Sequence, residues 1–210
     1  MATETTDCEL RDDWFFEQDV NAWTSLAYVA VGVVVVVVVV RRRLPPAFIA
    51  LGAVVALEGL GSALYHGRPS DAARLLHDVP MLGLLGFIAG WSVGRLHARG
   101  AELVALAGLV AGAVAGAAAS AAGATSVVAA VLVVVAAGAE FLAPRRGLPA
   151  VWNVPVVLLG AVAAATWLGG TSDSPLCDAQ SWLQPHGVWH VLSALAILGW
   201  TYRAMTTIAR

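Results

Sequence analysis

Two pairs of polar residues with the same spacing lie within apolar stretches of the sequence. The segment His186-Gly-Val-Trp-His190 places two imidazoles four residues apart, and Ser62-Ala-Leu-Tyr-His66 repeats that spacing with a hydroxyl and a third imidazole. Residues at i and i+4 lie on the same face of a helix, so the members of each pair can reach one site. Ionisable groups inside membrane segments are costly and usually functional. The pattern therefore predicts a metal site formed by His66, His186 and His190.

Three neutral imidazoles with one open position are typical of catalytic zinc, whereas structural zinc sites usually have four protein ligands and favour cysteine. Zinc lowers the pKa of a bound water to about 7, which gives hydroxide at neutral pH. A carboxylate is then needed to carry a proton to the leaving group, and Asp78, with His77 beside it, is the candidate. We expect Ser62 to hydrogen-bond an oxyanion or the zinc-bound water. Glu58 suits either a carboxylate that orients a ligand histidine or a buried packing partner.

The composition is that of a membrane protein. Of the 210 residues, 59% are hydrophobic and 12% are charged, against about 25% charged in soluble domains. The apolar runs are about 20 residues long, which is enough to cross a bilayer. No basic and aromatic cluster favours a nucleic-acid partner, and no obligate protein partner is indicated. Because all twelve basic residues are arginine, we infer a GC-rich bacterial genome and expect a multi-pass protein of the bacterial plasma membrane.

The apolar runs predict an all-α bundle of seven transmembrane helices. The expected helices are 21–40, 47–66, 73–92, 102–119, 124–142, 149–169 and 185–204. An acidic extracytoplasmic segment (1–20) would precede the helical domain (21–204), and a cytoplasmic tail (205–210) would follow it. The fourth and fifth helices give the weakest signal because they are rich in alanine and glycine. Pro80 and Pro155 are expected to kink their helices.

Arginine placement orients this bundle. Nine arginines fall at one set of helix ends and three at the other, and the positive-inside rule then puts the amino terminus outside and the carboxyl terminus in the cytoplasm. The first helix lacks a basic leader and a cleavage site, so we expect it to be retained. His66, His77, His186 and His190 all fall on the outer side in this topology. Only His97 lies in an inner loop, where we expect it to be exposed to solvent and to have no part in the metal site.

Three segments resemble the CREST superfamily, and most closely its alkaline ceramidase branch: 59–66 (GLGSALYH), 77–81 (HDVPM) and 186–190 (HGVWH). The resemblance implies a seven-helix zinc amidohydrolase that cleaves the N-acyl bond of ceramide or a related N-acyl lipid. It implies that His66, His186 and His190 bind zinc, that Ser62 assists, and that an aspartate handles protons or holds the water. In the family this aspartate follows the first zinc histidine by eleven residues. Here His77 stands at that position and Asp78 follows at twelve, so we favour Asp78 and keep His77 as the alternative.

The resemblance also implies a calcium site and a disulfide near the amino terminus. Oxygen ligands of the kind calcium prefers are Asp7, Glu9, Asp12, Asp13, Glu17 and Asn21. A solvated acidic flank is the alternative interpretation of these residues. Cys8 and Cys177 are the only cysteines and both fall on the outer side, where an oxidising exterior allows a bridge that ceramidases form at matching positions.

Two other functions compete with the hydrolase. A non-enzymatic lipid-binding receptor or sensor of the adiponectin-receptor type would keep the same metal ligands and tolerate loss of Asp78. A transporter would use the buried carboxylates and histidines as a proton relay, and it predicts paired repeats with a site at the midplane. No repeat is evident in the sequence, and the histidines lie off-centre.

Overall fold

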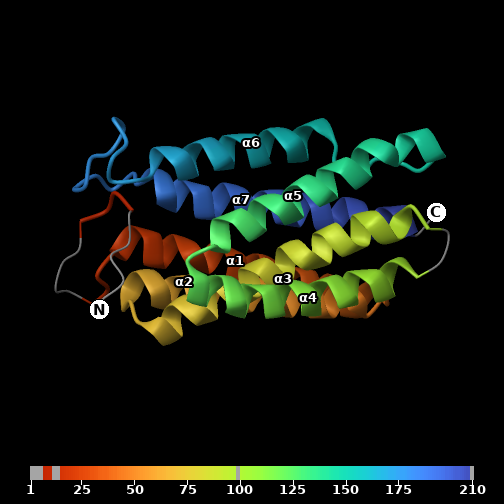
Figure 1. The fold of residues 1–210 in the computed structure, drawn as a ribbon, viewed down its shortest axis with the longest axis horizontal. Helices are drawn as coiled ribbons and strands as arrows, with labels where there is room; N and C mark the ends of the chain where they lie inside the picture. The colour runs from red at the N-terminus through yellow and green to blue at the C-terminus, as the bar shows by residue number, and fades with distance from the viewer. Residues whose placement is uncertain (1–6, 11–14, 98–99, 209–210) are drawn as a thin grey trace.

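The computed structural model describes residues 7–10, 15–97 and 100–208. These residues form seven α-helices that run up and down through one bundle, so α1 begins and α7 ends at opposite ends of the molecule (Figure 1). The helices are α1 (Asp19–Arg42), α2 (Ala47–Gly67), α3 (Asp71–Arg95), α4 (Ala101–Ala122), α5 (Thr125–Leu142), α6 (Val154–Gly169) and α7 (Pro185–Ile208), with a short 3₁₀ helix η1 (Pro144–Arg146) after α5. The predicted all-α architecture is confirmed.

Five of these helices, α1 to α5, are long and apolar enough to cross a membrane. Helix α6 is apolar but has only 16 residues, and α7 carries His186, His190 and Arg203 among its apolar side chains. The seven spans and the orientation of the termini therefore stay predictions. Helix α7 continues to Ile208, four residues beyond its predicted end.

The expectation that Pro155 kinks a helix is wrong. Helix α6 begins at Val154 rather than at 149, and Pro155 lies in its first turn, where the missing N–H of proline costs no helical hydrogen bond. Asn153 precedes the helix, and its side chain accepts a hydrogen bond from the backbone N–H of Val156 at 3.1 Å. This cap fixes the start of the helix. Pro80 does lie inside α3, as predicted.

Glycines allow α3 and α4 to pack backbone against backbone. A Cβ atom on Gly86 of α3 would lie 2.1 Å from the carbonyl oxygen of Gly108, and one on Gly112 of α4 would lie 2.1 Å from that of Leu82. Small residues at such contacts let membrane helices approach closely. The glycines and alanines that weaken the apolar signal of α4 thus account for its packing on α3.

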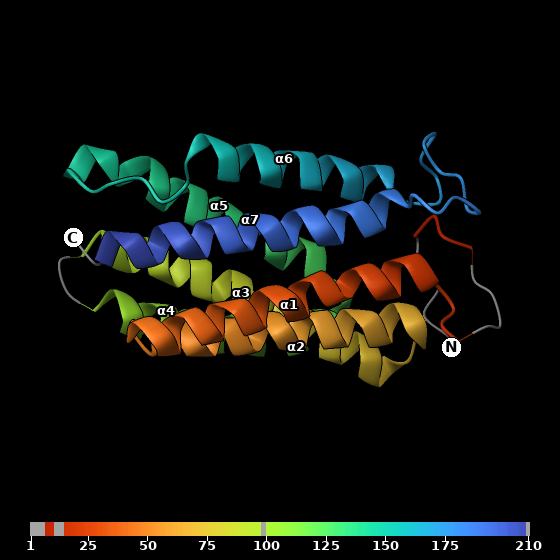
Figure 2. The same ribbon diagram turned by 180° about the vertical axis from the view of Figure 1, so that it is seen from behind.

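A similar close contact brings α2 against the beginning of α3. A Cβ atom on Gly61 would lie 2.0 Å from the carbonyl oxygen of Leu76. The neighbouring residue His77 on α3 is therefore held against α2, where it contacts Tyr65 and Glu58. Behind them, α7 runs alongside α1 and α6 (Figure 2).

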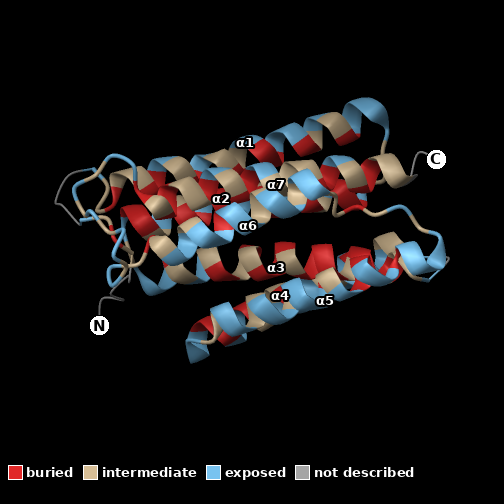
Figure 3. Ribbon diagram, turned by 90° about the horizontal axis from the view of Figure 1, so that it is seen from above, coloured by how far each residue is buried: buried red, intermediate tan, exposed pale blue. Residues whose placement is uncertain are grey.

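Burial divides the bundle into a packed interior and an apolar exterior. The interior contains an aromatic cluster in which Phe48 contacts Phe87 and Trp91, and buried residues line the inward faces of α1, α2, α3 and α7 (Figure 3). Large apolar side chains such as Val134 and Leu158 are exposed on the outer helices. An exposed surface of this kind fits contact with lipid rather than water.

Arginines fasten the loops at the carboxyl-terminal end of the bundle. Arg95 donates from Nη1 to Oε1 of the buried Glu140 at 2.8 Å, and Oε2 of the same carboxylate accepts from the backbone N–H of Val151 at 3.0 Å. Arg146 donates to the carbonyl of Leu96 at 3.1 Å. Some of the arginines that predict orientation thus also hold the connections between helices.

Candidate metal centre

The three histidines predicted to bind metal come together at the amino-terminal end of the bundle. His66 lies in the last turn of α2, and His186 and His190 lie in the first two turns of α7. All three are buried, and one ligand atom from each lies within 4.8 Å of the others. Their ring centroids are separated by 4.7 to 5.1 Å. His66 lies 120 and 124 positions before the other two histidines in the sequence.

Gln18, just before α1, orients the ring of His66. Nδ1 of His66 lies 2.9 Å from the side-chain oxygen Oε1 of Gln18. An amide oxygen only accepts hydrogen bonds, so Nδ1 of His66 carries the proton and donates. This tautomer makes Nε2 the ring nitrogen that can accept a metal.

Two hydroxyls of α1 do the same for His190. Its Nδ1 lies 3.2 Å from Oγ1 of Thr24 and 3.3 Å from Oγ of Ser25. The Thr24 hydroxyl donates to the carbonyl of Val20 at 2.7 Å. The Ser25 hydroxyl donates to the carbonyl of Asn21, also at 2.7 Å. Since both hydroxyl protons are directed to the helix backbone, the two oxygens accept from Nδ1 of His190, and Nε2 is again the nitrogen that could accept a metal.

The hydroxyl of Ser62 belongs to this same network. Ser62 Oγ lies 2.8 Å from Ser25 Oγ, and because Ser25 donates to its own helix, Ser62 is the donor. Ser62 is fully buried and is connected to His190 through Ser25. The sequence analysis did not assign Gln18, Thr24 or Ser25 to the site, although polar residues in the first turns of an apolar helix are a signal that it could have used.

The donor set fits zinc. Zinc binds imidazole nitrogens at about 2.0–2.1 Å in tetrahedral geometry, which places two such nitrogens roughly 3.4 Å apart. Three buried imidazoles with ligand atoms within 4.8 Å of one another are close enough to share one ion. The polar partners on Nδ1 are those that ligand histidines usually have, because they fix the ring and its tautomer.

His77 lies between two carboxylates. Its Nδ1 is 2.8 Å from Oδ1 of Asp78, and its Nε2 is 3.5 Å from Oε1 of Glu58. The ring of Tyr65 stacks on His77 at 5.3 Å and contacts the ring of His66 at 5.4 Å. Glu58, which we considered as a partner for a ligand histidine, therefore contacts His77.

Asp78 points toward α5 on the far side of His77. Its second oxygen, Oδ2, accepts a hydrogen bond from Oγ1 of Thr125 at 2.9 Å. Together with His77, Ser120 and Thr125 it lines a cavity of about 200 Å³. Asp78 thus contacts His77 directly. Of these two residues, His77 is the one that contacts Tyr65 and Glu58 on α2.

The residues predicted to bind calcium fall into two places. Asp7 lies against the histidine cluster, with Oδ1 3.2 Å from Nδ1 of His186. Glu9 instead accepts from the backbone N–H groups of Val20 and Asn21, at 2.6 and 2.8 Å, and so stabilises the first turn of α1. Calcium binding stays a prediction.

The remaining calcium candidates add little to this picture. Asn21 is fully buried, and it is its backbone N–H that contacts Glu9. The backbone N–H of Glu17 donates to the carbonyl of Gly67 at 2.9 Å, which ties the entrance of α1 to the end of α2. Asp12 and Asp13 lie outside the described residues.

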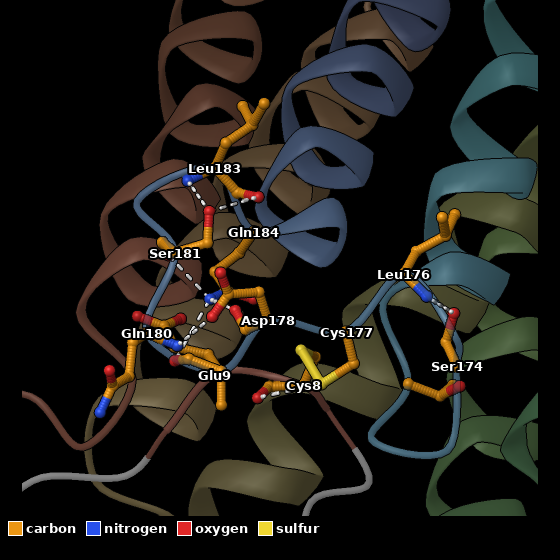
Figure 4. Close-up of a disulfide and its surroundings, with 12 residues drawn as sticks. Cys8, Glu9, Ser174, Leu176, Cys177, Asp178, Gln180, Ser181, Leu183 and Gln184 are labelled. Carbon is orange, nitrogen blue, oxygen red and sulfur yellow. Dashed lines mark hydrogen bonds between the residues drawn. A yellow bond between two sulfur atoms is a disulfide. The ribbon is translucent and has the colours of Figure 1, made fainter.

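The predicted disulfide between Cys8 and Cys177 is present. It joins the amino-terminal segment to the loop between α6 and α7 (Figure 4). Gln184 closes this loop just before α7, since its side chain donates to the carbonyls of Ser181 at 2.8 Å and Asp178 at 3.0 Å. The disulfide therefore fastens two segments that border the histidine cluster.

Comparison with known proteins gives one family match. Residues 17–209 match the family model named Ceramidase, a range that contains all seven helices and every histidine of the cluster. No curated protein matches the chain.

Proposed function

The chain belongs to the ceramidase family, and on this premise we propose that it is a zinc-dependent lipid amidase that works within the membrane. It hydrolyses the N-acyl bond of ceramide or of a related N-acyl lipid. A ceramidase-like hydrolase acting on amide bonds is what the family itself implies. Zinc as the metal and an N-acyl membrane lipid as the substrate are the proposed parts.

The buried cluster of His66, His186 and His190 is the observation that carries the proposal. Three imidazoles and no cysteine are typical of catalytic rather than structural zinc. A metal ion held there supplies a Lewis acid for the amide carbonyl and activates a bound water. The apolar exterior of the bundle suits a substrate that stays in the bilayer.

The chain's own groups account for the other requirements of amide hydrolysis. The Ser62 hydroxyl, one helical turn from His66, donates to Ser25 in the structure, and rotation of this hydroxyl would let it donate to the reacting oxygen instead. His77 and Asp78, joined at 2.8 Å, form the pair that we propose holds and delivers a proton to the leaving amine. Glu58 contacts the other nitrogen of His77 at 3.5 Å and restrains the ring from the opposite side.

The metal content of the purified protein tests the zinc site. We expect about one zinc per chain by elemental analysis, and we expect the His186→Ala, His190→Ala double variant to lose it while remaining folded. His97→Ala is the matched control, because His97 is an exposed histidine at the far end of α3. Undiminished zinc in the double variant would refute the site.

Lipid hydrolysis tests the activity. Parent protein in detergent is incubated with N-acyl lipids, ceramide among them, and released fatty acid is measured by mass spectrometry. We expect release by the parent and none by the double histidine variant. A parent protein that holds zinc but releases no fatty acid from any N-acyl or ester lipid would favour the receptor-like alternative.

A further inference from the structure

The amino-terminal segment delivers a carboxylate to the histidine cluster. Oδ1 of Asp7 lies 3.2 Å from Nδ1 of His186, and Oδ2 lies 3.6 Å from Nδ1 of His66. The Asp7 side chain is 12% exposed, so it is largely shielded from solvent. Sequence analysis placed Asp7 among the calcium candidates, and its contacts with the two histidines come from the tertiary structure alone.

Each histidine of the cluster has a polar group on its Nδ1 side. Gln18 occupies this position at His66, and Thr24 and Ser25 occupy it at His190. At His186 the corresponding group is the carboxylate of Asp7, which makes an ion-pair contact with Nδ1 at 3.2 Å rather than an aligned hydrogen bond. A carboxylate on the outer nitrogen of a ligand histidine fixes the tautomer and orientation of the ring and makes it a stronger ligand.

Backbone contacts hold Asp7 in this position. Asp7 pairs with Thr171 in an antiparallel bridge, and the N–H of Cys8 donates to the carbonyl of Gly170 at 2.8 Å. Gly170 in turn packs tightly on His186, since a Cβ atom on Gly170 would lie 2.7 Å from the backbone nitrogen of His186. The segment of Gly170 and Thr171, which pairs with Asp7 and Cys8, thus also contacts His186.

Covalent and polar links fasten the same segment on both sides. The disulfide joins Cys8, the residue after Asp7, to Cys177 (Figure 4). The carboxylate of Glu9 accepts from two backbone N–H groups at the start of α1, and the N–H of Leu10 donates to the carbonyl of Ala179 at 2.9 Å. Of these links, only the disulfide responds to reduction.

We propose that Asp7 is a positioning residue for the metal site, and that the Cys8–Cys177 disulfide keeps it on His186. The inference rests on the proposed zinc site. It means that the protein retains zinc most tightly when the disulfide is intact, so that an oxidising exterior favours the metal-loaded form.

Zinc affinity, measured by competition with a chelator of known affinity, tests the role of Asp7. We expect Asp7→Asn to weaken zinc binding by roughly 10- to 100-fold, the usual effect of removing a partner of a ligand histidine, with the unfolding midpoint of the metal-free protein unchanged. Asp173→Asn is the matched control, because Asp173 is an exposed carboxylate in the loop that carries Cys177; it should keep the parental affinity.

A double-variant comparison tests the disulfide. Treating the parent with a phosphine reductant, or replacing both cysteines with serine, should lower zinc affinity to about the level of Asp7→Asn. The same treatments should have little further effect on Asp7→Asn itself, because the group they release is already missing. Reduction that weakens zinc binding equally in the parent and in Asp7→Asn would overturn the link between the disulfide and Asp7.

His186→Ala separates this inference from the proposed function. Loss of zinc in His186→Ala together with parental affinity in Asp7→Asn would overturn the role of Asp7 and leave the zinc site intact. Loss as complete in Asp7→Asn as in His186→Ala would make Asp7 a ligand, which also overturns the positioning role. A parent that binds no zinc would refute the proposed function itself.

Discussion

The imidazoles of the histidine cluster have polar neighbours that determine which ring nitrogen carries the proton. Gln18 accepts from Nδ1 of His66, and Thr24 and Ser25 accept from Nδ1 of His190. Burying polar groups in a membrane protein is expensive unless they are paired. The pairing satisfies Nδ1 of His66 and of His190 and leaves Nε2 as the nitrogen that could accept a metal, so the same contacts would serve stability and the proposed function.

The pair His77 and Asp78 gives the first prediction at this scale. Asp78→Asn keeps the size of the side chain but cannot hold a protonated imidazole, and His77→Gln removes the group that exchanges the proton. We expect each variant to slow lipid-amide hydrolysis by about 10²–10⁴-fold, the usual value of acid–base assistance. Zinc content should stay close to that of the parent, because both residues lie outside the three-histidine cluster. Steady-state rates and elemental analysis of the same preparations give the result.

The two variants also distinguish two arrangements of the chemistry. Asp71→Asn is the control, since the Asp71 side chain is 84% exposed and pairs with Arg74. A large loss in His77→Gln with a small one in Asp78→Asn would assign the proton to His77 and a supporting part to Asp78. Parental rates in both variants would contradict any role of this pair.

Close helix packing sets the positions of these side chains. The first two turns of α1 carry Thr24 and Ser25, which contact His190, and the last turn of α2 carries His66. Gly61 sits where α2 touches the start of α3, with no room for a Cβ beside the carbonyl of Leu76. The distance between His66 and His77 therefore depends on a glycine that carries no chemistry of its own.

Gly61→Ala should separate α2 from α3 and lower both stability and hydrolysis. Forcing a methyl group into a packed contact costs about 1–3 kcal/mol, which a thermal or denaturant unfolding measurement in detergent can detect. Gly138→Ala is the control, because Gly138 lies within α5 and a Cβ there meets nothing within 4 Å; alanine should be neutral or stabilising at that position. Equal stability and activity of the two variants would show that the α2–α3 contact does not position the site.

The two ends of the whole molecule differ in chemistry. The histidine cluster, the disulfide and the start of α1 lie at one end. Arginines at 41–43, 95, 145–146 and 203 lie at the helix ends opposite to it. The positive-inside rule predicts that the arginine end faces the cytoplasm and that the metal site faces outward, where a disulfide persists.

Thiol labelling on intact cells tests this orientation. A cysteine introduced at Ser172, in the loop beside the disulfide, should react with a membrane-impermeant maleimide, whereas one introduced at Arg42 should react only after the cells are lysed. Both positions are exposed, so a difference in labelling reflects the side of the membrane. Labelling of the Arg42 position alone in intact cells would reverse the orientation.

The sequence by itself was sufficient to predict the all-helical fold, the clustering of the three histidines and the family. Apolar runs of about 20 residues identify helices because a bilayer requires that length, and the His186 and His190 pair is visible because helical periodicity puts i and i+4 on one face. The predicted start of α6 was wrong. The apolar pattern begins several residues earlier, whereas Asn153 and Pro155 define the actual start of the helix.

Only the tertiary structure decided which residues surround the histidines. Asp7 and Gln18 precede the first helix, where no periodicity indicates a direction for a side chain, and their contacts with His66 and His186 span from 48 to 179 positions of the chain. The order of Asp78, His77 and Glu58 across α3 and α2 likewise follows from the close contact at Gly61. Such contacts depend on how helices pack against one another, and helix packing is determined by surfaces that the local sequence pattern does not specify.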